Sequence, residues 1–161
     1  MQQPDLPPEY LMRPVHPADV ERIGLQRYRM FTEAGWPDDE RMQAMNTAFI
    51  PWLESALARG EYFGWMIEHQ GEPVAGLGMF WLSWPPHPLD AGTRRGYLLN
   101  IYTEPAHRGK GLASALVRQG LATSRAAGVT VTALHATKIG RPLYESLGFS
   151  GSSEMFWIEP A

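Results

Sequence analysis

The segment from residue 98 to 113 constrains this chain more than any other, because a loop with two glycines joins a strand-like run to a helix-like run. Gly109 and Gly111 carry no Cβ, so backbone N–H groups in this loop can approach an anion closely. The helix start that follows adds unpaired N–H donors and a partial positive charge. The segment therefore predicts a phosphate cradle. Three side chains can add contacts to it, namely Arg108, Lys110 and Ser114.

Two common phosphate-binding loops do not fit these residues. The dinucleotide fingerprint requires glycine or alanine at its sixth position, where this chain has Ser114, and an acidic residue about 20 positions later, where it has Val131. The P-loop requires a glycine five positions before its Gly-Lys pair, where this chain has Glu104, and a serine or threonine after the pair, where it has Gly111. Both motifs are therefore excluded.

Apolar periodicity and turn residues predict alternating strands and helices along the chain. Strands are expected at residues 10–15, 62–69, 73–82, 97–103, 129–134 and 149–158. Helices are expected at residues 17–31, 38–59, 111–127 and 142–147. Pro51 is expected to divide or kink the second helix.

Three local features refine this outline. Gly76 and Gly78 lie inside an expected strand and indicate a β-bulge or a close backbone approach. Residues 83–95 contain three prolines and predict a long loop of the kind that often binds ligands. The third helix has one apolar stripe, formed by Ala113, Leu116, Val117, Gly120 and Leu121.

The composition excludes several classes of function. A formal net charge of −3 gives no general attraction to nucleic acid or to an anionic membrane, so neither partner is expected. No apolar run approaches the ~18 residues of a spanning helix, and the start of the chain has no targeting pattern, so a cytoplasmic location is expected. Without cysteine, an acyl-cysteine intermediate and a thiolate metal site are impossible. Residues 1–161 are expected to form a single domain, with 1–9 as a flexible lead.

Two motifs in this chain resemble those of the GNAT N-acetyltransferase superfamily. The run from Arg108 to Ala113, which follows a strand ending at Thr103, resembles its Arg-x-x-Gly-x-Ala acyl-CoA motif. The run from Pro142 to Phe149 resembles its Leu-Tyr-Glu-x-Leu-Gly-Phe signature. The resemblance is close over 97–149 and implies that this part is the acyl-CoA-binding and catalytic core.

The resemblance also implies a fold. A GNAT-like α/β (α+β) fold has a central mixed, mostly antiparallel sheet of about six or seven strands flanked by helices. In such a sheet we expect the strands at 97–103 and 129–136 to splay apart, so that the acyl donor can enter between them.

Family roles carry over onto matching positions of this sequence. The backbone of Ile101, Tyr102 and Thr103 is implied to bind the pantetheine arm of acetyl-CoA. Tyr144 resembles the general acid that protonates the departing thiolate, and a phenol with a pKa near ~10 suits this role. Thr137 stands where many relatives have a cofactor-binding asparagine. The pyrophosphate is implied to contact Arg108, Gly109, Lys110, Gly111, Leu112, Ala113 and Ser114.

The general base departs from the family pattern. Some relatives supply a glutamate on the strand before the pyrophosphate loop, where this chain has Gly96, Tyr97 and Leu98. The base then lies elsewhere or acts through a water chain. The titratable residues considered are Glu33, Glu61, His87, Asp90 and His135.

Acceptor specificity is expected from the first half of the chain and from the 83–95 loop. Of the aromatic residues there, Trp36 and Trp84 are favoured to touch the acceptor. The other aromatic residues considered are Tyr28, Phe31, Trp52, Trp65 and Trp81, most of them expected in the core.

The resemblance predicts direct transfer of an acetyl group from acetyl-CoA to a primary amine of a small molecule or peptide, in a chain that forms a homodimer or stays monomeric. Two alternatives stay open. One is a noncatalytic acyl-CoA-binding module, suggested by the missing carboxylate at 96–98, and the other is a protein that uses the cradle for a different nucleotide.

Overall fold

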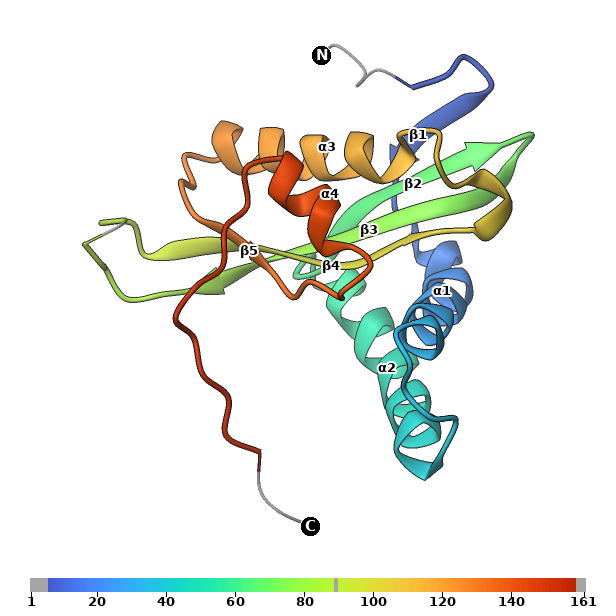
Figure 1. The fold of residues 1–161 in the computed structure, drawn as a ribbon, viewed down its shortest axis with the longest axis horizontal. Helices are drawn as coiled ribbons and strands as arrows, with labels where there is room; N and C mark the ends of the chain where they lie inside the picture. The colour runs from blue at the N-terminus through green and yellow to red at the C-terminus, as the bar shows by residue number, and fades with distance from the viewer. Residues whose placement is uncertain (1–5, 89, 159–161) are drawn as a thin grey trace.

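A five-stranded sheet forms the centre of the computed structural model, which describes residues 6–88 and 90–158 (Figure 1). The strands lie in sequence order, and all neighbours pair antiparallel except β4 and β5, which pair parallel. The mixed, mostly antiparallel sheet is confirmed, with five strands instead of six or seven in the described residues. The strands are β1 Tyr10–Pro14, β2 Phe63–His69, β3 Glu72–Ser83, β4 Arg94–Thr103 and β5 Thr132–Leu134.

Helices cover both faces of the sheet. Figure 1 shows α1 and α2 on one face and α3 and α4 on the other. The α-helices are α1 Val20–Glu33, α2 Glu40–Ala58, α3 Leu112–Ala126 and α4 Arg141–Ser146, and short 3-10 turns lie at Pro17–Asp19 and Pro105–His107. One apolar core joins α3 to the sheet through residues such as Leu116, and a second joins α1 and α2 to it through residues such as Leu53. In the described part of the chain, no helix has both the length and the apolar character needed to cross a bilayer.

A β-bulge shapes the middle of the sheet, where Gly76 and Gly78 of β3 pair with Tyr102 and Leu99 of β4. Two β4 residues therefore face one residue of β3, and Asn100 adopts a positive φ of 53°. A Cβ on Gly78 would lie 2.0 Å from the hydroxyl oxygen of Tyr62. Both expected uses of these glycines, a bulge and a close approach, are confirmed.

β4 and β5 separate soon after they meet. Their pairing covers three residues of each strand and ends at Leu98 and Leu134. Beyond that point β4 continues to Thr103, whereas the chain after β5 turns toward α4. The expected splay is therefore present.

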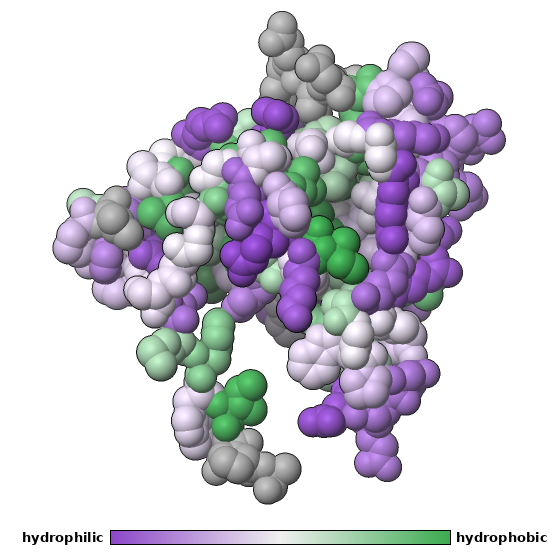
Figure 2. Space-filling model, viewed as in Figure 1, coloured by the Kyte–Doolittle hydropathy of each residue, from purple (hydrophilic) through white to green (hydrophobic). Residues whose placement is uncertain are grey.

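Three expected elements differ in the structure. Residues 149–158 form no strand, because no neighbouring strand edge pairs with them. The strand preference of their side chains takes effect only when they pack on the half-buried surface of a sheet. Their apolar side chains, from Met155 to Ile158, are exposed (Figure 2), and the Phe156 ring lies 5.1 Å from that of His135. The strand at 129–134 shortens to β5, and Pro51 does not divide α2. Residues 1–5 of the expected flexible lead lie outside the described residues.

The buried carboxylate of Asp19 anchors α1 to β1. Arg13 donates to its two oxygens at 2.7 and 2.8 Å, and the backbone N–H of His16 donates at 2.7 Å. Burial alone raises the pKa of Asp19, but these hydrogen bonds outweigh it and hold the pKa below its ordinary value. The carboxylate therefore stabilises the fold above its unfolded-state pKa of ~4, and this contribution is lost as the pH falls through the lower folded-state value.

We expect Asp19→Asn to lower the free energy of unfolding by about 2 kcal/mol at pH 7, since Arg13 loses an ionic partner while staying half-buried. The difference from wild type should narrow below about pH 4, where the carboxylate of the unfolded wild-type chain begins to protonate, and should close as the pH falls through the lower folded-state pKa. Urea denaturation at pH 7 and pH 3 measures both values. Glu72→Gln, which breaks the exposed pair with Arg22, is the control and should change stability by less than about 0.5 kcal/mol. A pH-independent difference for Asp19→Asn would contradict the assignment.

Candidate functional site

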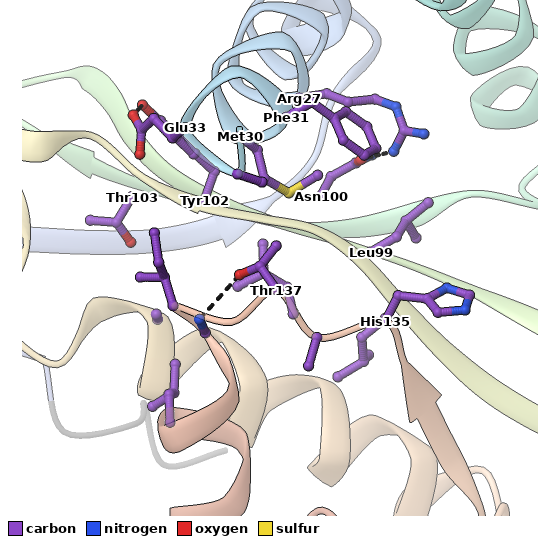
Figure 3. Close-up of a pocket in the computed structure, with 18 of the residues that line it drawn as sticks. Arg27, Met30, Phe31, Glu33, Leu99, Asn100, Tyr102, Thr103, His135 and Thr137 are labelled. Atoms are coloured by element: carbon purple, nitrogen blue, oxygen red, sulfur yellow. Dashed lines mark hydrogen bonds between the residues drawn. The ribbon is translucent and has the colours of Figure 1, made fainter. Parts of the chain in front are cut away.

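A cavity of about 1610 Å³ passes through the sheet where β4 and β5 separate. Its walls come from α1 and α2 on one face, and from the 108–114 loop and helix start and α4 on the other. Residues 97–103 of β4 and 135–140 after β5 line the passage between them. Figure 3 shows Arg27, Met30 and Phe31 entering from α1, and Thr137 and His135 entering from the segment after β5. The cavity therefore has one end lined by α1 and α2 and another lined by the 108–114 segment and α4, and the two ends meet at β4.

The loop before α3 presents a row of free backbone donors. Gly109 and Gly111 have φ angles of 75° and 78°, a conformation that glycine adopts without strain. The first helical hydrogen bond runs from the N–H of Ala115 to Gly111. No hydrogen bond to a described residue is recorded for the N–H groups of residues 109–114. These orphan donors at a helix N-terminus are suited to bind an oxyanion.

The rotation of α3 explains how its first turn reaches the cavity. The buried stripe contains Leu116, Val117 and Gly120 as expected, with Leu112 and Ala115 in place of Ala113 and Leu121. Ala113 and Ser114 are consequently only half-buried and line the cavity.

The two cationic side chains of the loop point elsewhere in this structure. The Arg108 guanidinium pairs with Glu33 at 2.6 Å and donates to the carbonyl of Thr103 at 2.9 Å, so it ties the loop to α1 and β4. The Lys110 ammonium donates to the Tyr10 hydroxyl at 2.9 Å. All the site residues expected from the sequence line the cavity except Lys110.

Tyr144 combines burial with an available hydroxyl. Its residue is 8% exposed, and burial raises the pKa of its phenol above the ordinary value. Its ring packs edge-on against Phe149, with centroids 6.0 Å apart. No hydrogen bond from its hydroxyl is recorded within the described residues. Thr137 lines the cavity nearby, and its hydroxyl accepts from the N–H of Gly140 at 3.1 Å. The Tyr144 hydroxyl is therefore a protonated donor that is free for a ligand.

Only two of the five titratable residues considered for the base line the cavity. Glu33 accepts from Tyr102 at 2.8 Å as well as from Arg108. Burial, with the hydrogen bond to Glu33 as the next cause, raises the pKa of Tyr102 to about 12. His135 shares a hydrogen bond with the Tyr97 hydroxyl through Nδ1. The residues that the structure does not bring to the cavity are Glu61, His87 and Asp90.

The aromatic residues divide between the cavity and the core. Trp36 and Trp52 line the cavity from the helical side and are 58% and 45% exposed. Trp65 and Trp81 pack against the core. Trp84 instead lies against the Arg95 guanidinium, and no described residue of the 83–95 loop lines the cavity. Contact between Trp36 and the acceptor therefore stays a prediction, whereas the expectation for Trp84 and its loop is wrong for this cavity.

Sequence reasoning missed Arg27 and Asn100, which meet in the cavity wall. Arg27 donates to the Asn100 side-chain oxygen at 2.6 Å across 73 positions of sequence. The sequence did carry a signal, because Arg27 lies four residues after Ile23 and four before Phe31, on the inward face of α1. A charged residue on an apolar helical face is a marker of a functional site.

Comparisons with known proteins agree with this geometry. Residues 25–149 match the acetyltransferase (GNAT) family. The chain is similar to a GCN5-related N-acetyltransferase from Ralstonia eutropha JMP134, with 40% identity, a TM-score of 0.90, and 93% of this chain and 98% of that chain covered. A search of curated proteins found no match.

More distant structures share the fold. A predicted acetyltransferase from Clostridium acetobutylicum, solved with acetyl-CoA, has 23% identity and a TM-score of 0.83, with 93% of this chain and 96% of that chain covered. An aminoglycoside antibiotic 6'-N-acetyltransferase from Acinetobacter haemolyticus has 18% identity and a TM-score of 0.68, with 94% and 98% covered. With its family match over most of its length and a relative at 40% identity, the chain belongs to the GNAT acetyltransferase family.

Proposed function

We propose that this protein transfers an acetyl group from acetyl-CoA to a primary amine by direct attack. The observation that carries the proposal is that one cavity contains both the row of orphan N–H groups at residues 109–114 and the free hydroxyl of Tyr144. The first feature suits the pyrophosphate of acetyl-CoA, and the second suits its sulfur. The acetyl-CoA present in the similar Clostridium structure supports the same donor.

Different segments of the chain bind different parts of acetyl-CoA. The backbone N–H groups of residues 109–114 hold the pyrophosphate, and the unpaired edge of β4 at residues 101–103 holds the pantetheine arm. Arg108 acts mainly by fixing the loop through Glu33 and Thr103. The thioester then lies in the gap between β4 and the segment after β5.

The transfer step needs one proton donor and one proton acceptor. The amine nitrogen attacks the thioester carbonyl carbon, a C–N bond forms, and the C–S bond breaks. The departing thiolate takes the proton of the Tyr144 hydroxyl, which its raised pKa keeps protonated at neutral pH. Glu33 is already held by Arg108 and Tyr102, so we assign the ammonium proton to an imidazole nitrogen of His135, which lines the same cavity.

Amine-dependent release of CoA tests the proposal. We expect acetyl-CoA to be turned over in the presence of a panel of primary amines and to be stable in their absence. Detection of the free thiol measures the reaction, and mass spectrometry of the acceptor locates the acetyl group on nitrogen. Tight binding of acetyl-CoA without turnover across the panel would instead favour a noncatalytic module, to which the absence of a carboxylate at 96–98 points.

A further inference from the structure

The cavity holds an arginine whose charge has no counter-ion in the described part of the chain. Arg27 of α1 lines the cavity, and no carboxylate of the described residues pairs with it. Its only recorded hydrogen bond is the one from Nη1 to Asn100, and its buried Nε has no acceptor. A guanidinium has five N–H donors, so most of those on Arg27 are unused. Burial lowers the pKa of Arg27, which reflects the cost of holding this charge away from water.

The surroundings of Arg27 hold it in one place. The rings of Phe31 and Phe49 lie 4.8 and 4.7 Å from the guanidinium carbon, so the cation is held between two aromatic faces. Asn100 is itself fixed, because its side-chain nitrogen donates to the Tyr62 hydroxyl at 3.1 Å. Figure 3 shows Arg27, Phe31 and Asn100 grouped beside β4. Arg27 is therefore preorganised, and its remaining N–H donors have no acceptor among the described residues.

The charge of the cavity favours an anionic group there. Among the described lining residues, the arginine and lysine side chains are those of Arg27, Arg108 and Lys138, and Glu33 is the only carboxylate. Glu33 already pairs with Arg108. A polycationic amine would consequently meet positive charge and find no free carboxylate. The orphan N–H groups at 109–114 lie in the loop and first turn of α3, on the opposite face of the sheet from α1, so Arg27 is separate from the proposed pyrophosphate cradle.

We propose that Arg27 binds an oxyanion of the acceptor, so that the acceptor is an amine that also carries a carboxylate or a phosphate. This inference rests on the proposed function and assigns the substrate class of the same site. The planar guanidinium can hold either oxyanion through two parallel hydrogen bonds. Trp36 and Trp52 line the same helical side and offer an aromatic surface to the rest of the acceptor. Asn100 is a positioning residue that acts through Arg27.

Calorimetric titration of the CoA-loaded protein tests the oxyanion site without requiring turnover. The probes are benzoate, phenyl phosphate and neutral benzamide. We expect at least one anion to bind about 10-fold or more tighter than benzamide, as charge-assisted hydrogen bonds should give, and the tighter anion identifies the oxyanion. Equal affinity for all three, or no binding of either anion, overturns the proposal.

Two variants locate the effect at Arg27. Arg27→Met keeps a long unbranched side chain but removes the guanidinium charge, so the preference for anions should disappear. Asn100→Asp is isosteric and supplies a carboxylate 2.6 Å from Nη1, so it should remove the preference while the guanidinium stays in place. Arg22→Met, a change of the same type on the exposed side of α1, should keep the preference. The Kd of acetyl-CoA should change by less than about 3-fold in all three, and a larger loss confined to Arg27→Met and Asn100→Asp would assign Arg27 to the donor instead.

Turnover separates this inference from the proposed function. L-phenylalanine and L-phenylalanine amide differ in the anionic group, as do O-phosphoethanolamine and ethanolamine. We expect the anionic member of one pair to have a higher kcat/KM, mainly through KM, and Arg27→Met to remove the difference. Anion binding through Arg27 without any acetylation would contradict the proposed function alone, whereas acetylation that is indifferent to Arg27 would contradict the oxyanion site alone.

Discussion

Gly111→Glu is expected to weaken acetyl-CoA binding by at least about 100-fold. Gly111 has a φ of 78° immediately before α3, and a Cβ built there meets nothing within 4 Å, so a new side chain enters the open space beside the orphan N–H groups. The glutamate brings a negative charge to the place where the pyrophosphate should bind. Loss of two hydrogen bonds to a charged group would cost about 3 kcal/mol or more, which corresponds to this change in affinity. Calorimetry with acetyl-CoA measures it.

Gly71→Glu is the matched control for this experiment. Gly71 has a φ of 82° in the turn between β2 and β3, is exposed, and does not line the cavity. Both glutamates therefore impose the strain of a positive φ, about 1–2 kcal/mol, and the same charge. Only Gly111→Glu should lose the ligand. Wild-type affinity in a folded Gly111→Glu variant would place the pyrophosphate elsewhere.

The parts of the site that could be predicted from sequence are those made by neighbouring residues. The loop at 108–111 is predictable because glycine at two positions permits the positive φ angles that leave its backbone N–H groups free to bind a ligand. The hairpin of β2 and β3 was equally predictable, since Gln70 and Gly71 both adopt positive φ in a two-residue turn.

The remaining parts depend on contacts that sequence spacing does not reveal. Arg27 meets Asn100 across 73 positions, and Lys110 turns away to Tyr10 across 100 positions. Residues 149–158 have strand-like side chains, but a strand also needs a neighbouring edge, and in the described residues β5 offers an edge of only three residues. Local propensity could not show which segments would find a partner.

The environment of Tyr144 determines what the loss of its hydroxyl should do. The ring is buried among Leu143, Phe149 and the neighbouring core, so phenylalanine can keep its packing. The hydroxyl makes no recorded hydrogen bond with the described residues, so its removal leaves no protein group unsatisfied. Its main contribution should therefore come when negative charge develops on the sulfur of the leaving group.

Tyr144→Phe is expected to lower kcat at least about 100-fold, which corresponds to roughly 3 kcal/mol in the activation free energy. The free energy of acetyl-CoA binding should change by less than about 1 kcal/mol. Burial raises the pKa of Tyr144 above the ordinary ~10, so the wild-type phenol is protonated from pH 6 to 9 and the deficit should be constant over that range. Single-turnover kinetics at several pH values measure the chemical step directly.

Tyr28→Phe removes a hydroxyl outside the cavity and should leave kcat within about 2-fold of wild type. The deficit should shrink with an acyl donor whose thiol is more acidic, because such a thiolate leaves with less protonation. A near-normal chemical step in Tyr144→Phe would make Tyr144 a packing residue and leave the thiolate to be protonated by water or another group.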